Sequence, residues 1–94
     1  MVADEFRSSL QNSQPDPSYS ALLQALWWAC KGDWEQSHDL VNDCPGADGA
    51  RLHANLHREE GDLGNANYWY RRAGQKAPDC SWQDEREQLI DDFL

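Results

Sequence analysis

Apolar residues recur at spacings of three and four along most of this chain, and short polar breaks containing glycine or proline separate the segments. Such spacing places apolar side chains on one face of a helix. No segment alternates apolar and polar residues between turn signals, as a half-buried strand does. The pattern therefore predicts an all-α protein with a short helical stretch at 3–11 and helices over 17–31, 34–43, 49–60, 63–75 and 81–94.

Glycine–aspartate pairs mark two of the breaks, at Gly32–Asp33 and Gly61–Asp62. Glycine ends a helix readily because it adopts a positive φ without steric cost, and aspartate caps the next helix by accepting from a free backbone N–H. Both pairs are therefore expected to join antiparallel helices. Further helix starts are predicted at Asp16 with Pro17 behind it, at Asp48 and at Ser81.

The two breaks belong to an internal repeat. Sliding the chain so that Gly32 lies on Gly61 also places Ala25 on Ala54 and Leu23 on Leu52. Each hairpin of such a pair leaves an apolar face that only a neighbour buries. The sequence thus predicts two stacked helical hairpins of one design.

The second unit resembles a tetratricopeptide repeat. Its match consists of Gly61-Asp62-Leu63, Ala66, Tyr70, Ala73 and Pro78, with the small residue Ala54 on the preceding helix. In the first unit Val41 and Cys44 replace the family's aromatic residue and alanine, so the chain is tetratricopeptide-like over about 19–78. The stretch His53 to Gly74 also resembles a signature of small uncharacterised microbial proteins, which implies no activity.

This resemblance implies a domain over 17–94, with 1–16 as an amino-terminal arm and the helix at 81–94 as a cap on the open end of the stack. Core packing is expected for five large residues at helical spacing: Trp34, Leu52, Leu56, Leu63 and Tyr70. The remaining aromatic pair, Tyr68 and Trp69, is expected to lie beneath the final helix with Trp82, Leu89 and Phe93.

The charge balance excludes several partners. Among 94 residues there are 17 acidic and 8 basic side chains, a net charge of -9, which disfavours nucleic acids and anionic membranes. There is no run of roughly 18 to 20 apolar residues and no signal-peptide pattern at the start, so a cytoplasmic protein is expected. Three cysteines without a C-x-x-C pair are expected to be free thiols.

His53 and His57 lie four residues apart on one helix face, with Glu60 one turn further on. Imidazole and carboxylate groups at this spacing suit a transition-metal ion, although Ala54 stands where an H-E-x-x-H site has its glutamate. No nucleophile elbow, phosphate loop or dinucleotide motif is present, and no cofactor is predicted. A small metalloprotein or enzyme using these residues is the alternative to a packing role for both histidines.

The first helix of each repeat lines the concave face in proteins of this kind. By helical counting, the resemblance places an apolar half of the groove at Tyr19, Leu22 and Leu26 and a polar half at Arg51, Asn55 and Arg58. The leading hypothesis is thus a non-catalytic interaction module that binds a peptide or a partner helix. An exposed apolar surface of this kind is expected to be covered. Three candidates could cover it: the arm through Phe6 and Leu10, a partner peptide, or a second copy of the chain.

Overall fold

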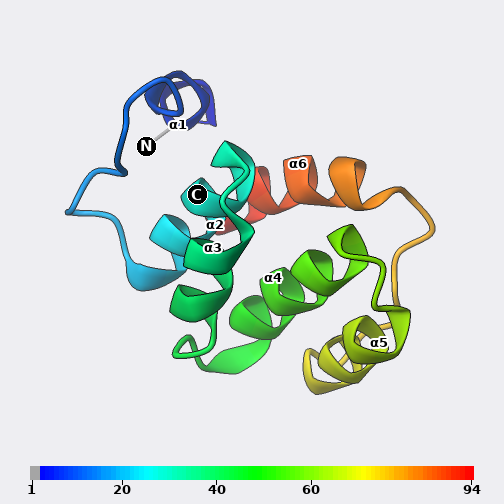
Figure 1. The fold of residues 1–94 in the computed structure, drawn as a ribbon. Coiled ribbons are helices and arrows are strands. Elements are labelled where there is room, and N and C mark those ends of the chain that lie inside the picture. The colour runs from blue at the N-terminus through cyan, green and yellow to red at the C-terminus, as the bar shows by residue number, and fades with distance from the viewer. Residues whose placement is uncertain (1–2) are drawn as a thin grey trace.

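A helix forms in each segment for which the apolar spacing predicted one, although some of the ends differ. The computed structural model describes residues 3–94, and the helices there are α1 (Ala3–Ser9), α2 (Ala21–Lys31), α3 (Trp34–Val41), α4 (Gly46–Glu59), α5 (Leu63–Arg72) and α6 (Trp82–Phe93) (Figure 1). No strand occurs within this described part, so the all-α prediction is confirmed. None of these helices combines the length and apolar character needed to cross a lipid bilayer.

The two glycine–aspartate breaks are equivalent bends, as predicted. Gly32 has φ 92° after α2 and Gly61 has φ 84° after α4, a region that favours glycine. Asp33 then accepts from the backbone N–H of Gln36, and Asp62 accepts in the same way from Asn65, at 3.1 Å in each case. These caps satisfy donors that helix geometry leaves free, which fixes the starts of α3 and α5.

Two predicted helix starts are wrong. Asp16 does not begin α2, because its carboxylate accepts from the N–H and hydroxyl of Ser18 in a local turn, and Ser20 caps the helix instead. α4 begins at Gly46 rather than after Asp48, with Pro45 at the N-cap position and no side-chain cap. The start of α4 therefore keeps backbone N–H groups that no side chain satisfies.

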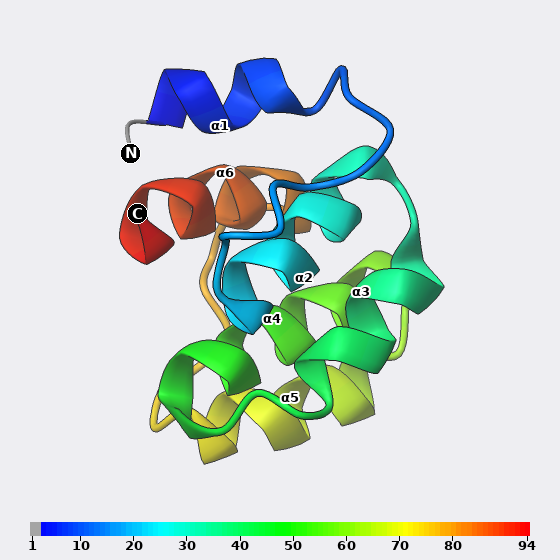
Figure 2. The ribbon, with the colours of Figure 1, turned by 90° about the vertical axis from the view of Figure 1, so that its left-hand side faces the viewer.

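The helices pair as two hairpins, α2 with α3 and α4 with α5. α6 packs on α4 and α2, while α1 and α5 lie at opposite ends of the molecule in both views (Figures 1 and 2). The main core joins residues of α1, α2, α4 and α6, including Phe6, Leu26, Trp27, Leu52, Leu56 and Leu89. The cysteines are free thiols, and burial raises the pKa of Cys30 to about 11.

The expected positions of three apolar residues on α5 are wrong. Leu63 is 62% exposed and Tyr68 is 44% exposed, so neither lies in the core. Trp69 stacks on His53 of α4 instead of lying beneath the final helix. The reason is that α6 lies along α4, where Arg58 and Asn55 bind Glu85.

α1 folds back onto the domain, at the top of the view in Figure 2. Phe6 is fully buried and its ring lies 6.2 Å from that of Tyr19. The indole N–H of Trp27 donates to the hydroxyl of Ser9 at 3.1 Å. Arg7 binds Glu87 of α6 at 2.7 Å. The arm thus covers apolar surface of α2 that would otherwise face water.

Candidate metal centre

Three histidine rings meet where α3 lies beside α4. His53 and His57 stand one turn apart on α4, and His38 comes from α3. The Nε2 atoms of His53 and His38 are 3.0 Å apart, and one ring nitrogen from each of the three residues lies within 4.8 Å of the others. His53 and His57 are buried and His38 is half-buried. The arrangement offers three nitrogen ligands to one point in space.

Trp34 fixes the relative position of the two helices. Its indole N–H donates to the carbonyl of Leu56 at 2.8 Å, which joins the start of α3 to the end of α4. Its ring stacks on His38, one turn further along α3, with centroids 4.6 Å apart and planes 10° from parallel. It also meets His57 edge-on at 5.9 Å. Two of the three imidazoles are therefore held against one rigid aromatic ring.

Glu60 orients His57. Its carboxylate lies 2.6 Å from Nδ1 of His57, so the proton of the neutral ring is held on Nδ1 and Nε2 keeps its lone pair. Metal-binding histidines commonly donate their second ring nitrogen to a carboxylate in this way, which fixes the tautomer and makes the ligand more basic. Asp62 has a carboxylate oxygen within 4.8 Å of the same pair.

The surroundings keep two of the three imidazole rings, those of His53 and His38, uncharged. Burial and the neighbouring histidines lower the pKa of His53 to about 4. Burial and His57 also lower the pKa of His38. Both rings are therefore neutral at pH 7, the form that donates a lone pair to a metal ion.

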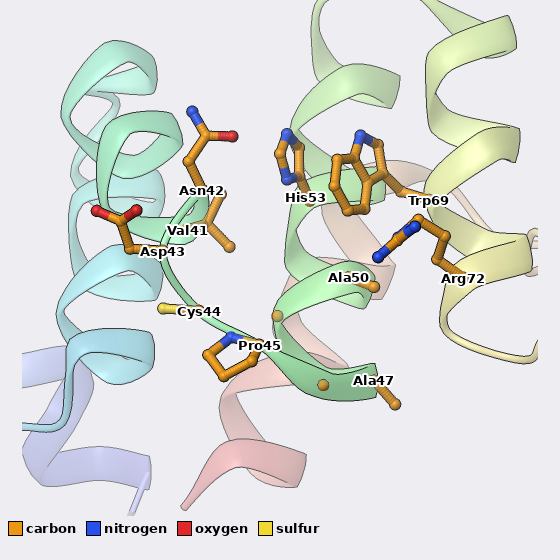
Figure 3. A pocket seen from close by; sticks show the side chains of 12 residues that line it. Val41, Asn42, Asp43, Cys44, Pro45, Ala47, Ala50, His53, Trp69 and Arg72 are labelled. Atoms are coloured by element: carbon orange, nitrogen blue, oxygen red, sulfur yellow. The ribbon is translucent and has the colours of Figure 1, made fainter.

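A pocket of about 370 Å³ lies on the other side of His53 (Figure 3). The end of α3, the loop 42–45, the start of α4 and two residues of α5, Trp69 and Arg72, form its walls. The ring of Trp69 lies flat on that of His53, with centroids 3.9 Å apart. His38 and His57 do not line this pocket, so His53 alone connects it to the histidine cluster.

Comparisons of the sequence with protein-family models and with curated proteins, and of the fold with solved structures, gave no match.

The residues of the alternative metal site, His53, His57 and Glu60, lie near one another, but Glu60 pairs with His57 alone. The rings of His53 and His57 have centroids 5.1 Å apart, and the carboxylate of Glu60 contacts Nδ1 of His57. The residue that sequence reasoning missed is His38. The sequence feature that could have indicated His38 is its position one turn after Trp34. Both residues lie on the face of α3 that packs against α4.

The residues predicted to line an open groove have partners inside the domain. Leu26 is fully buried, Leu22 packs against the core, and Tyr19 contacts Phe6 of α1. In the polar half, Arg51 binds Asp92 of α6 at 2.7 Å. The residues predicted for the two halves of the groove are therefore covered by α1 and by α6.

Glu85 of α6 occupies the centre of the polar half. One of its carboxylate oxygens accepts from the hydroxyl of Tyr70 at 2.6 Å, from the amide of Asn55 at 2.8 Å and from Arg58 at 3.1 Å. Arg86 donates to the amide oxygen of Asn55 at 2.8 Å. Asn55 and Arg58 thus serve an internal network that binds α6 to the second hairpin.

Proposed function

We propose that this protein binds a transition-metal ion through His38, His53 and His57. The observation that carries the proposal is the convergence of three imidazoles from two helices, of which His38 and His53 are held in their neutral form. A carboxylate behind His57 and a tryptophan against His38 add the outer contacts that metal sites use. A packing role alone needs neither three convergent rings nor a carboxylate that fixes a tautomer.

Zn²⁺ is the ion that suits these ligands best. Imidazole nitrogens bind Zn²⁺ at about 2.0–2.1 Å in a tetrahedral arrangement, which places two ligand nitrogens roughly 3.3 Å apart. The 3.0 Å between the Nε2 atoms of His38 and His53 needs only a small opening to reach that separation. Three protein ligands leave the fourth position for water or another molecule. Cu²⁺ and Ni²⁺ also accept imidazole and are the competing ions.

The test uses protein purified without a histidine tag. Elemental analysis after purification, followed by calorimetric titration of the metal-free protein with Zn²⁺, should give one ion per chain. His38→Ala should abolish or strongly weaken this binding, because it removes one of three ligands. His38 is half-buried, so its replacement disturbs the core less than a change at His53.

Glu35→Gln is the matched control, since Glu35 lies on α3, is exposed and is not part of the cluster. It should bind Zn²⁺ as the parent protein does. Circular dichroism of both variants establishes that the helices are intact. A folded His38→Ala protein that binds Zn²⁺ with parental affinity would reject the metal-binding function.

A second candidate, favoured by the position of α1, is an interaction module of tetratricopeptide-like hairpins. α1 is a separate short helix that sits with Phe6 buried on the face containing Tyr19, Leu22 and Leu26, as a bound peptide would. A partner helix of similar apolar character would compete for this place. The α1 helix of a second copy is such a partner, and exchange would give a homodimer.

This candidate is tested with the full chain. Phe6→Asp should release α1 and let the protein bind a labelled peptide of residues 1–16, measured by fluorescence anisotropy. The unchanged protein should bind the peptide more weakly, because its own α1 occupies the site. Light scattering over a dilution series reports the homodimer. If the Phe6→Asp protein is folded and does not bind the peptide, the face containing Tyr19, Leu22 and Leu26 does not bind a helix from another molecule.

A further inference from the structure

We propose that a second pocket, where α2, α4 and α6 meet, binds a small, flat, neutral molecule that carries a cyclic amide, as a pyrimidine base does. Its volume is about 280 Å³, and its walls are the end of α2, the last residue of α4 and the first half of α6, which is orange in Figure 1. His38, His53 and His57 do not line this pocket. The site is therefore distinct from the proposed metal centre, and its ligand should bind with or without Zn²⁺.

The walls of this pocket hold a buried donor and a buried acceptor that both lack a hydrogen-bond partner. Within residues 3–94, three buried side-chain polar atoms are in this condition, and two of them, Nη2 of Arg86 and Oε1 of Glu59, belong to residues that line the pocket. Nη1 of Arg86 lies 2.6 Å from Oε1 of Glu59, so the two side chains form an ion pair, but the direction of this contact is not that of a hydrogen bond. Since a buried polar atom without a partner is costly, a ligand that supplies both partners is favoured.

The guanidinium of Arg86 is fixed in place by its other nitrogen atoms. Nε donates to the amide oxygen of Asn55 at 2.8 Å, and Nη1 donates to the backbone carbonyl of Ala29 at 3.2 Å. Arg86 is only 7% exposed. The N–H groups on Nη2 therefore keep one direction, and a donor that is already oriented loses little entropy when a ligand binds.

The charges around the pocket are balanced, which favours a neutral ligand over an ion. Glu59 pairs with Arg86, and Glu87 pairs with Arg7 of α1 at 2.7 Å. Burial raises the pKa of Cys30 to about 11, so the thiol in the wall is also uncharged at pH 7. An anion would meet the carboxylates of Glu59 and Glu87 here, and a cation would meet the guanidinium of Arg86.

A cyclic amide matches this donor and acceptor. Its carbonyl oxygen and its N–H lie side by side in one plane, so the oxygen accepts from Nη2 of Arg86 while the N–H donates to the carboxylate of Glu59. The faces of the ring would contact the apolar wall formed by Ala29, Cys30 and the half-buried ring of Trp82. The Trp82 ring also covers the guanidinium, with its centroid 4.7 Å from Cζ of Arg86, and a small turn of this side chain admits the ligand.

The experiment is an NMR titration of the full chain with uracil. Saturable shifts are expected for the indole N–H of Trp82 and for the backbone amides of Gly32 and Gln83, which line the pocket. The amide of Gly64 on α5 lies outside the pocket and should not shift. Uracil methylated on both nitrogens keeps the flat ring and the carbonyl groups but has no N–H, so it should bind about tenfold more weakly. Benzoate, an anion of similar size, should also bind more weakly than uracil.

Glu59→Gln should weaken uracil binding about tenfold, because it removes the charge from the acceptor. Glu35→Gln is the matched control, since Glu35 is exposed on α3 and does not line this pocket. Circular dichroism establishes that both variants are folded. Equal uracil affinities in the two folded variants would overturn the proposal.

The unchanged protein gives a test that does not depend on the folding of any variant. The proposal is rejected if uracil causes no saturable shifts, or if methylated uracil or benzoate binds as tightly as uracil. Titration of the same protein with Zn²⁺ separates the two sites. Uracil binding without Zn²⁺ binding rejects only the metal centre, and Zn²⁺ binding without uracil binding rejects only this pocket.

Discussion

Trp69 lies flat against His53, with ring centroids 3.9 Å apart and planes 11° from parallel. His53 is in turn in contact with His38 through its Nε2 atom. One residue of α5 thus fixes the orientation of an imidazole on α4 that faces α3. The three helices are tied to one another at the centre of the proposed metal site.

Replacing Trp69 should weaken metal binding without removing a ligand. Stacking of this kind contributes about 0.5–1.5 kcal/mol beyond the area it buries, so Trp69→Leu should lower Zn²⁺ affinity by roughly two- to tenfold. Trp69→Phe keeps a flat ring in this place and should lose less. Calorimetric titration of both variants measures the difference. A Trp69→Leu protein with unchanged Zn²⁺ affinity would show that the stack does not position His53.

The hydroxyl of Tyr70 is predicted to stabilise the fold. It donates to the buried carboxylate of Glu85 at 2.6 Å, and burial together with that carboxylate raises the pKa of Tyr70, which keeps the hydroxyl protonated. A hydrogen bond to a charged group contributes about 1.5–3 kcal/mol, so Tyr70→Phe should lower the free energy of unfolding by that amount. Urea denaturation measures it. Tyr68→Phe is the control, since Tyr68 is 44% exposed, and should change stability far less.

Much of the fold was predictable because its signals are local. The bends at Gly32 and Gly61 follow from a glycine that adopts positive φ and an aspartate that caps the next helix. The start of α2 was missed because Ser20 competes with Asp16 as a cap, and sequence pattern does not rank two adjacent cap residues. The place of α6 depends on long-range contacts such as that between Asn55 and Glu85, which no local pattern encodes.

The candidate site was predictable only within one helix. The spacing of His53 and His57 placed both on one face of α4, since helical periodicity is short-range. His38 joins them across an interhelical contact, and the stacking of its ring on Trp34 becomes visible only when α3 and α4 are placed together. The pocket beside His53 was missed for the same reason, because its walls come from α3, α4 and α5. α4 begins at Gly46 on one side of it, whereas sequence reasoning placed the start of this helix after Asp48.

The metal-free protein should lose stability as the pH falls from about 7 to about 5. Burial lowers the pKa of His53 from 6.5 to about 4, so between these values the unfolded chain binds more protons than the folded one. The contribution of His53 is therefore complete above pH 6.5 and decreases as the pH falls toward 4.

Urea denaturation with a chelator present, at pH 7, 6 and 5, measures this dependence. Most carboxyl groups titrate below about pH 4.5, so this window isolates the histidines. His53→Gln does not take up a proton and should show a shallower decrease in stability over the same range. An unchanged slope in a folded His53→Gln protein would contradict the assignment.

Gly49 is predicted to be essential for the junction of α3 with α4. A Cβ atom built there lies 2.3 Å from the carbonyl oxygen of Cys44, a backbone atom that cannot move aside cheaply. Gly49→Ala should therefore lower the free energy of unfolding by about 1–3 kcal/mol and displace the loop 42–45, which lines the pocket beside His53. Gly64→Ala is the matched control, because its nearest contact is a flexible carboxylate oxygen at 3.9 Å; there the gain in helix propensity should raise stability by up to about 1 kcal/mol. Thermal denaturation of the two variants should shift in opposite directions, and a Gly49→Ala protein as stable as the parent would mean that Cys44 and α4 are not packed as closely as described.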